Sequence, residues 1–247
     1  MLAGINRKAI YSFAAVVTIG LCCRCSVTAH TLQEKLHQLT EYQPPATSPE
    51  EQLVNVARHF QIPIGIEWVE RDTKADPPAP LNFTKGSVLE LLTAIVDRGP
   101  KQALIVEDRI VCVFAPAEFH NPLNFLNFDI ERYCVTSEPL LGAEFVLRLE
   151  IDQRLYPDKF KNGFAGGYGG GEKDFWIKEI NICINHTNIR DVLTEIAAQS
   201  GKAGWLATLK PDELHARQPF WKGVPLNEYG TSPLTGRWHF FVVREQK

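Results

Sequence analysis

The side chains that could bind a metal or act as nucleophiles are scattered along this 247-residue chain. None of the seven histidines belongs to a His-Glu-x-x-His motif, and none lies at zinc-finger spacing from the cysteines beyond residue 29. No Gly-x-Ser-x-Gly motif is present, so the usual signature of acyl-transfer chemistry is missing. The sequence therefore predicts no metal site, no cofactor and no catalytic residue, and it favours a protein without enzymatic activity.

A glycine-rich segment at 163–171 has the composition of a phosphate-binding loop, with six glycines in nine positions. Such a loop requires Gly-Lys-Ser or Gly-Lys-Thr at the start of a helix, but Gly171 is followed by Glu172 and Lys173. No strand-to-helix turn is expected around the segment, which argues against a dinucleotide fingerprint. We therefore interpret 163–171 as a flexible inserted loop.

The six cysteines fall into two groups of three. The first group lies within the first 29 residues, and the second consists of Cys112, Cys134 and Cys183. An odd number of cysteines permits at most one intramolecular bridge within the second group. Because all three lie in apolar, strand-like segments, we expect small buried thiols.

Composition and charge exclude several other classes of protein. Hydrophobic residues make up 45% of the chain and charged residues 22%, which is ordinary for a globular protein. The formal net charge is −3, from 26 basic and 29 acidic residues. A mildly acidic chain without a long basic run is a poor candidate for binding nucleic acid.

The first 29 residues have the organisation of a secretory signal. Arg7 and Lys8 precede an apolar run at 9–21, and 27–29 (Val-Thr-Ala) forms a small-residue cleavage site. The apolar run is shorter than the about 20 residues that a membrane-spanning helix needs. We therefore predict removal of 1–29 and a periplasmic or secreted protein without a membrane span. Retention of the segment as an anchor is the alternative.

Two helices are expected near the start of the predicted mature chain. Thr31 and Glu34 have the spacing of a capping box, and the segment 30–45 is typical of a short helix followed by a proline-rich linker. Ser48 is expected to cap a second helix whose first residue is Pro49.

An apolar strand is expected at 62–69. Its alternation places four residues on one face: Ile62, Ile64, Ile66 and Trp68. A proline-rich loop follows, so we expect the flank of this strand to be uncovered and the strand to lie at the edge of a sheet. In an envelope protein, such an edge is a place where a partner strand can add. The alternative is a central, fully paired strand.

The next stretch has the clearest pattern in the chain. A short strand is expected at 81–84, and Ser87 and Glu90 form the capping box of an amphipathic helix. Two further strands, at 103–107 and 110–115, follow that helix.

The same order recurs 101 residues later. Asn188 is expected to cap a helix with Asp191 in its first turn, and the sequence at 92–95 (Leu-Thr-Ala-Ile) aligns with that at 193–196 (Leu-Thr-Glu-Ile). Strands are expected at three places around this helix: 180–185, 203–208 and 238–243. We therefore predict an α+β fold of two small mixed-sheet units with crossing helices, related by an internal duplication. The units span 46–119 and 120–247, and the second carries the insertion at 163–171.

The region 48–116 resembles the secretin and TonB short N-terminal domain, a small periplasmic module. The resemblance rests on the strand at 81–84, the helix at 86–92 and the closing pair of strands, with a looser second copy near 180–208. It implies a periplasmic, non-catalytic fold that binds other proteins. No binding residue of that family can be transferred to a position in this chain.

We therefore expect an exported, non-catalytic protein-interaction module of the bacterial cell envelope, with a protein partner. The alternative is an envelope glycan-binding protein or hydrolase that uses the loop at 211–238. The aromatic residues of that loop are Phe220, Trp221, Tyr229 and Trp238. Exposed aromatic rings can stack on sugars or anchor a partner, whereas buried rings would form a local core beneath a long loop.

Overall fold

The computed structural model describes residues 31–70, 80–99, 102–160, 179–226, 232–234 and 236–243. The predicted signal at 1–29, the glycine-rich segment at 163–171 and Tyr229 lie outside the described residues.

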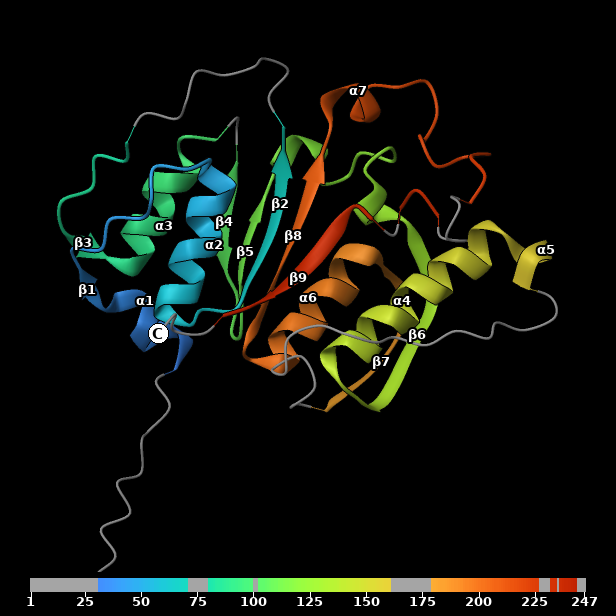
Figure 1. Cartoon of the computed structure of the whole chain (residues 1–247), viewed down its shortest axis with the longest axis horizontal. Helices are drawn as coiled ribbons and strands as arrows, with labels where there is room; N and C mark the ends of the chain where they lie inside the picture. Colours follow the sequence, from blue (N-terminus) through green and yellow to red (C-terminus); the bar gives the residue numbers. More distant parts are fainter. Residues whose placement is uncertain are drawn as a thin grey trace, which may run out of the picture.

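A five-stranded mixed sheet lies at the centre of the described chain (Figure 1). Its strands, in spatial order, are β4 (Ala103–Val106), β5 (Val111–Phe114), β2 (Ile64–Val69), β8 (Ala203–Leu209) and β9 (Trp238–Val242). Strand β2 runs parallel to both of its neighbours, β5 and β8, whereas the two outer pairs are antiparallel. Strands from both predicted units therefore join one sheet, with β2 in the middle.

The central position of β2 contradicts the expectation that 62–69 forms an edge strand. Gly65 is in register with Cys112 on one side and with Trp205 on the other. The four residues proposed as a partner edge are all buried: Ile62, Ile64, Ile66 and Trp68. Alternation indicates which side chains share a face, but it carries no information about which strands lie alongside. The edge-strand prediction is therefore wrong.

Three helices cover one face of the sheet: α1 (Leu32–His37), α2 (Pro49–Phe60) and α3 (Val88–Val96). Their apolar residues pack against Ile64 and Ile66 of β2 and against Val111 and Val113 of β5, in a cluster that we call the first core. These four strand residues are at most 1% exposed. The face that alternation predicts for β2 is therefore the one that the helices bury.

A small two-stranded sheet extends this layer. Strand β1 (Leu39–Thr40) pairs antiparallel with β3 (Gly86–Ser87), which leads directly into α3. The strand expected at 81–84 is therefore misplaced: those residues lie outside any strand, and the pairing occurs immediately before the helix. The backbone N–H of Val88 also donates to the carbonyl of Gln38, which fixes this position.

The opposite face of the sheet is covered by α6 (Ile189–Ser200), beside α4 (Leu140–Leu155) and the paired strands β6 (Asp129–Glu138) and β7 (Ile180–Asn188). Their apolar residues and Ala203, Trp205 and Ala207 of β8 form a second core. Strand β6 was not predicted, because exposed charged residues interrupt its alternation. The remaining short elements are α5 (Pro157–Phe160), α7 (Pro211–Leu214) and the 3-10 turns η1 (Pro116–Glu118) and η2 (Phe125–Asn127).

The α+β class is confirmed, with mixed sheets and seven α-helices in the described part of the chain. Capping residues set where several helices begin. Ser87 of α3 forms a capping box with Glu90, and the side chain of Asn188 accepts a hydrogen bond from the backbone of Asp191 in α6. These caps satisfy N–H groups that have no partner within the helix.

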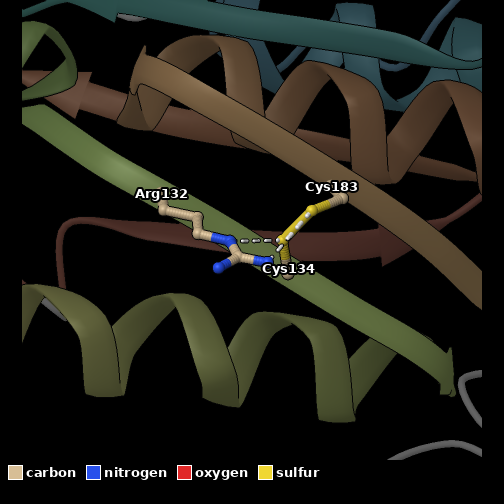
Figure 2. The surroundings of a disulfide bond; sticks show 3 residues. All are labelled: Arg132, Cys134 and Cys183. Carbon is tan, nitrogen blue, oxygen red and sulfur yellow. Dashed lines mark hydrogen bonds between the residues drawn. A yellow bond between two sulfur atoms is a disulfide. The ribbon is translucent and has the colours of Figure 1, made fainter.

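Cys134 of β6 and Cys183 of β7 form a disulfide (Figure 2). The expectation of buried thiols is therefore wrong for these two residues. They face each other directly in the antiparallel register, with their Cα atoms 4.1 Å apart, which the sequence alone could not show. Arg132 lies beside the bond and donates from Nε to Sγ of Cys134 at 3.2 Å.

A disulfide is compatible with an oxidising location outside the cytoplasm. Within the described ranges, no helix has both the length and the apolar character needed to cross a bilayer.

Candidate functional site

A buried ion pair joins the central strand to α6. Glu67 lies in β2 and is fully buried, and Arg190 is the second residue of α6 and is 7% exposed. The Nε of Arg190 donates to Oε2 of Glu67 at 2.8 Å. Alternation along β2 explains the geometry, because Glu67 points away from the first core and toward the face that α6 covers.

Two asparagines and an aromatic ring complete this network. Asn124 donates from Nδ2 to Oε1 of Glu67 at 2.7 Å, and Arg190 donates from Nη1 to Oδ1 of Asn127 at 2.6 Å. The guanidinium carbon of Arg190 lies 4.3 Å from the ring centre of Phe119, within the range of a cation–π contact. The charged pair is thus held by polar groups from the segment around η1 and η2.

Burial dominates the electrostatics of Glu67. Removal from water raises the pKa of its carboxyl group, although the positive charge and hydrogen bond of Arg190 and the hydrogen bond from Asn124 act in the opposite direction. A buried ion pair of this kind adds little net stability compared with apolar packing. A gain in net stability therefore does not explain why a charged pair lies in the middle of the sheet.

A cavity of about 420 Å³ lies beside this pair, between the sheet and α6. Its apolar lining consists of Gly65, Ile105, Cys112, Phe114, Phe119 and Trp205. Its charged lining consists of Glu67, Glu107, Arg190, Asp191 and Glu195. We call this space the Glu67–Arg190 cavity.

The absence of a side chain at Gly65 shapes one wall of the cavity. A Cβ atom at this position would lie 2.7 Å from both Cε2 and Nε1 of Trp205, closer than side chains tolerate. Glycine therefore allows the indole of Trp205 to lie flat against β2. Trp205, which is 2% exposed, both lines the cavity and belongs to the second core.

Negative charge prevails at the rim. Glu195 is paired with Arg109, whose Nη2 lies 3.0 Å from each carboxylate oxygen. Glu107 and Asp191 form no ion pair with any other residue that the structure describes. Asp191 does share a hydrogen bond with Asn188, 2.8 Å from Nδ2 to Oδ2.

The negative charge at the rim affects the pKa of the Cys112 thiol. Burial, Glu107 and Asp191 together raise its pKa to about 12, and Arg190 only partly opposes them. At neutral pH the sulfur is therefore a protonated thiol, which is a poor nucleophile and a poor metal ligand. The described residues also contain no group of three or more His, Cys, Asp and Glu side chains placed to hold a metal.

Two N–H donors that line the cavity have no hydrogen-bond partner among the described residues. They are Nη2 of Arg190 and Nε1 of Trp205, and both atoms are buried. Buried donors are nearly always satisfied. Other unpaired donors occur in the described residues, such as Nε of Arg237 and Nε1 of Trp238. The donors of Arg190 and Trp205, however, belong to residues that line one cavity. Such donors are typical of a place where a ligand or an ordered water completes the hydrogen bonding. The arrangement is suited to binding rather than to catalysis.

A larger cavity, of about 640 Å³, lies over β6 and α4. Its lining includes exposed charged residues such as Glu131, Arg132 and Arg154, and the last of these is already paired with Asp129 at 2.8 Å. No buried ion pair lines it. None of the unpaired buried donors found among the described residues belongs to its lining. We therefore regard the smaller Glu67–Arg190 cavity as the candidate site.

The aromatic residues singled out in the sequence do not form an exposed platform in the described part of the chain. Trp221 and Trp238 are 8% and 2% exposed and belong to the second core, and Phe220 packs against that core. Tyr229 lies outside the described residues. These three rings therefore pack in or against the second core and do not form a solvent-exposed platform.

Sequence reasoning missed Glu67, although one signal was available. Glu67 is the one charged residue in the apolar stretch 62–69. A charge within a strand that is buried on both faces is costly unless it is paired, and so it marks a special position. Its partner, Arg190, is 123 residues away in the chain, and nothing in the sequence links the two.

Comparisons of this chain with protein-family models, with curated proteins and with solved structures gave no match.

Proposed function

We propose that this protein is an exported, non-catalytic protein-interaction module of the bacterial cell envelope, and that a partner binds at the Glu67–Arg190 cavity. The observation that carries the proposal is the pair of unsatisfied buried donors, Arg190 Nη2 and Trp205 Nε1, around one cavity. A network that keeps a charged pair beside an open, partly apolar space is typical of a binding site.

Several observations support export and the family resemblance. The Cys134–Cys183 disulfide suits an oxidising compartment, in agreement with the signal-like segment at 1–29. In both halves a strand leads into a capped helix, which is followed by an antiparallel pair: β3, α3, β4 and β5, and then β7, α6, β8 and β9. This shared order supports an internal duplication and a likeness to the short periplasmic module.

The chemistry of the cavity favours binding over catalysis. Cys112 lines the cavity together with the charged pair, and its raised pKa keeps the thiol protonated. The alternative of a glycan-binding protein or hydrolase depends on exposed rings in the loop 211–238. Trp221 and Trp238 are buried, which weighs against this alternative.

A matched pair of substitutions tests the proposal. Thr194 lines the cavity on α6, so Thr194→Trp fills it. Thr93 occupies the corresponding, exposed position on α3, over the other face of the sheet, so Thr93→Trp is the control. Both variants and the unmodified protein are used to capture proteins from envelope extract, after thermal unfolding has shown that all three are folded.

We expect the unmodified protein and Thr93→Trp to retain the same partner, and Thr194→Trp to lose it. Capture of the same proteins in the same amounts by all three would refute a partner site at this cavity.

A further inference from the structure

Strand β4 is one of the two outer strands of the central sheet, and part of its backbone points outward. The backbone N–H of Glu107 donates to the carbonyl of Ile110 at 2.9 Å across the turn between β4 and β5. Hydrogen-bonded and non-hydrogen-bonded pairs alternate along an antiparallel ladder. Ile105 therefore bonds toward β5, whereas the N–H and C=O groups of Leu104 and Val106 point to the outer side. No described strand pairs with that side.

The two outer strands differ in exposure. Four of the five residues of β9 are buried, with exposed fractions of at most 8%. Every residue of β4 is at least partly exposed. Ile105 is 49% exposed and is one of three exposed large apolar side chains in the part of the chain that the structure describes. An outer strand with accessible backbone and an exposed apolar residue is a place where another strand can add.

The Glu67–Arg190 cavity reaches this edge. Ile105 of β4 and Glu107, the residue that follows β4, both line the cavity. A strand added beside β4 would lie about 4.8 Å away, with alternate side chains on the two faces of the sheet. A residue opposite Ile105 would therefore point toward the cavity, and its two neighbours would lie beside Leu104 and Val106 over the first core.

The charged residues that line the cavity indicate which type of partner residue would lie opposite Ile105. Glu107 and Asp191 both line the cavity, and neither forms an ion pair with another described residue. The apolar side chains of Ile105 and Phe114 line the same cavity. A lysine or arginine fits both features, because its aliphatic stem packs on apolar surface while its charged end reaches a carboxylate.

We propose that the partner adds an extended segment to the outer edge of β4 and places a lysine or arginine side chain against Glu107 and Asp191, at the acidic rim of the Glu67–Arg190 cavity. This inference rests on the proposed function and specifies its partner chemistry. Backbone pairing with Leu104 and Val106 supplies affinity, and the acidic rim selects the basic side chain.

Three blocked five-residue peptides serve as probes: TVKVT, its glutamate counterpart TVEVT and a third with norleucine in the centre. The valines suit Leu104 and Val106, and the central residue suits the cavity. Binding to the 15N-labelled protein is followed through the backbone amides of 103–106 and the indole N–H of Trp205. We expect the lysine peptide to shift both sets of signals, the norleucine peptide to bind about fivefold more weakly, and the glutamate peptide not to saturate.

Two variants test separately the contribution of the rim charge and that of backbone pairing at the edge of β4. Glu107→Gln should bring the lysine and norleucine peptides to similar affinities. Val106→Pro removes an outward N–H and should weaken all peptides that bind, whereas Val106→Ala removes similar apolar surface and keeps the N–H. Thermal unfolding confirms that each variant is folded.

Equal binding of the lysine and glutamate peptides, or the absence of any shift at 103–106 with millimolar peptide, would overturn the inference. The proposed function is judged separately. If Thr194→Trp loses a partner that Thr93→Trp retains while no peptide binds, the cavity is a partner site with a different chemistry.

Discussion

Arg190 in the first turn of α6 donates to Glu67 in the central strand, although the two residues are 123 positions apart in the chain. Both side chains are more than nine-tenths buried. This contact attaches the helix of the second half to a strand of the first half at the candidate site.

Removal of Arg190 alone should destabilise the fold far more than removal of both charges of the Glu67–Arg190 pair. Arg190→Met leaves the Glu67 carboxylate buried without its cation, and we expect a loss of about 3–5 kcal/mol in the free energy of unfolding. The double variant Glu67→Gln/Arg190→Met should recover most of that loss, because no buried charge remains. Urea unfolding of the two single variants and the double variant measures the coupling. Additive losses would contradict a direct interaction.

The pH dependence of Arg190→Met follows from the same contact. Burial already raises the folded-state pKa of Glu67 above its unfolded value, and loss of Arg190 raises it further. A group with a raised folded pKa contributes stability at low pH, and this contribution is lost as the pH rises through the folded pKa. The deficit of Arg190→Met relative to the unmodified protein should therefore be smaller at pH 4 than at pH 7. An equal deficit at both would count against an ionised Glu67.

Reduction of the Cys134–Cys183 disulfide should destabilise the fold. The bond closes a loop with a sequence separation of 49, for which loop entropy gives up to about 4 kcal/mol. Dithiothreitol should lower the urea midpoint of the unmodified protein and of Cys112→Ala alike. The Cys134→Ala/Cys183→Ala variant should start at the lower midpoint and show no further response to reductant.

Cys112 should be nearly unreactive in the folded protein. A pKa of about 12 lowers the thiolate fraction at pH 8 by about 1,000-fold relative to a thiol of pKa 9.0, and the greater nucleophilicity of a more basic thiolate recovers part of this. We expect iodoacetamide to modify Cys112 about 50-fold more slowly in the native state than in urea. A native rate close to that of the unfolded chain would show that the cavity does not shield the thiol.

Glu90 should contribute to stability in a pH-dependent way. Hydrogen bonds from the backbone and hydroxyl of Ser87 lower the pKa of its carboxyl group. Because the folded pKa is depressed, the stabilisation is present above the unfolded pKa and is lost as the pH falls through the folded pKa. Glu90→Gln should therefore lower the melting temperature more at pH 7 than at pH 3. Glu50→Gln, which removes a first-turn charge from α2, controls for the helix dipole.

Local structure was largely predictable, because its causes are local. Ser87, Glu90 and Asn188 identify helix starts through side-chain hydrogen bonds that reach only three residues. The face of β2 followed from its alternation for the same reason.

The arrangement of these elements was not predictable. The neighbours of β2 depend on hydrogen bonds to residues 111–113 and 205–209, which leave no periodic trace in the sequence. The same holds for the disulfide, because the pairing of Cys134 with Cys183 follows from the register of two strands joined by a long connection. The site combines Glu67, Asn124 and Arg190, whose proximity is purely tertiary.

The shared central strand also constrains how the chain matures. During synthesis, which proceeds from the N-terminus, β2 can pair with β5 soon after both strands are made. The other edge of β2 stays unpaired until β8, at 203–209, has been made. During that interval an apolar strand exposes unpaired backbone to whatever lies nearby. The N-terminal half in isolation should therefore be prone to aggregation and should depend on a holding chaperone. The C-terminal half, supplied as a separate fragment, should pair with β2 and reduce this aggregation.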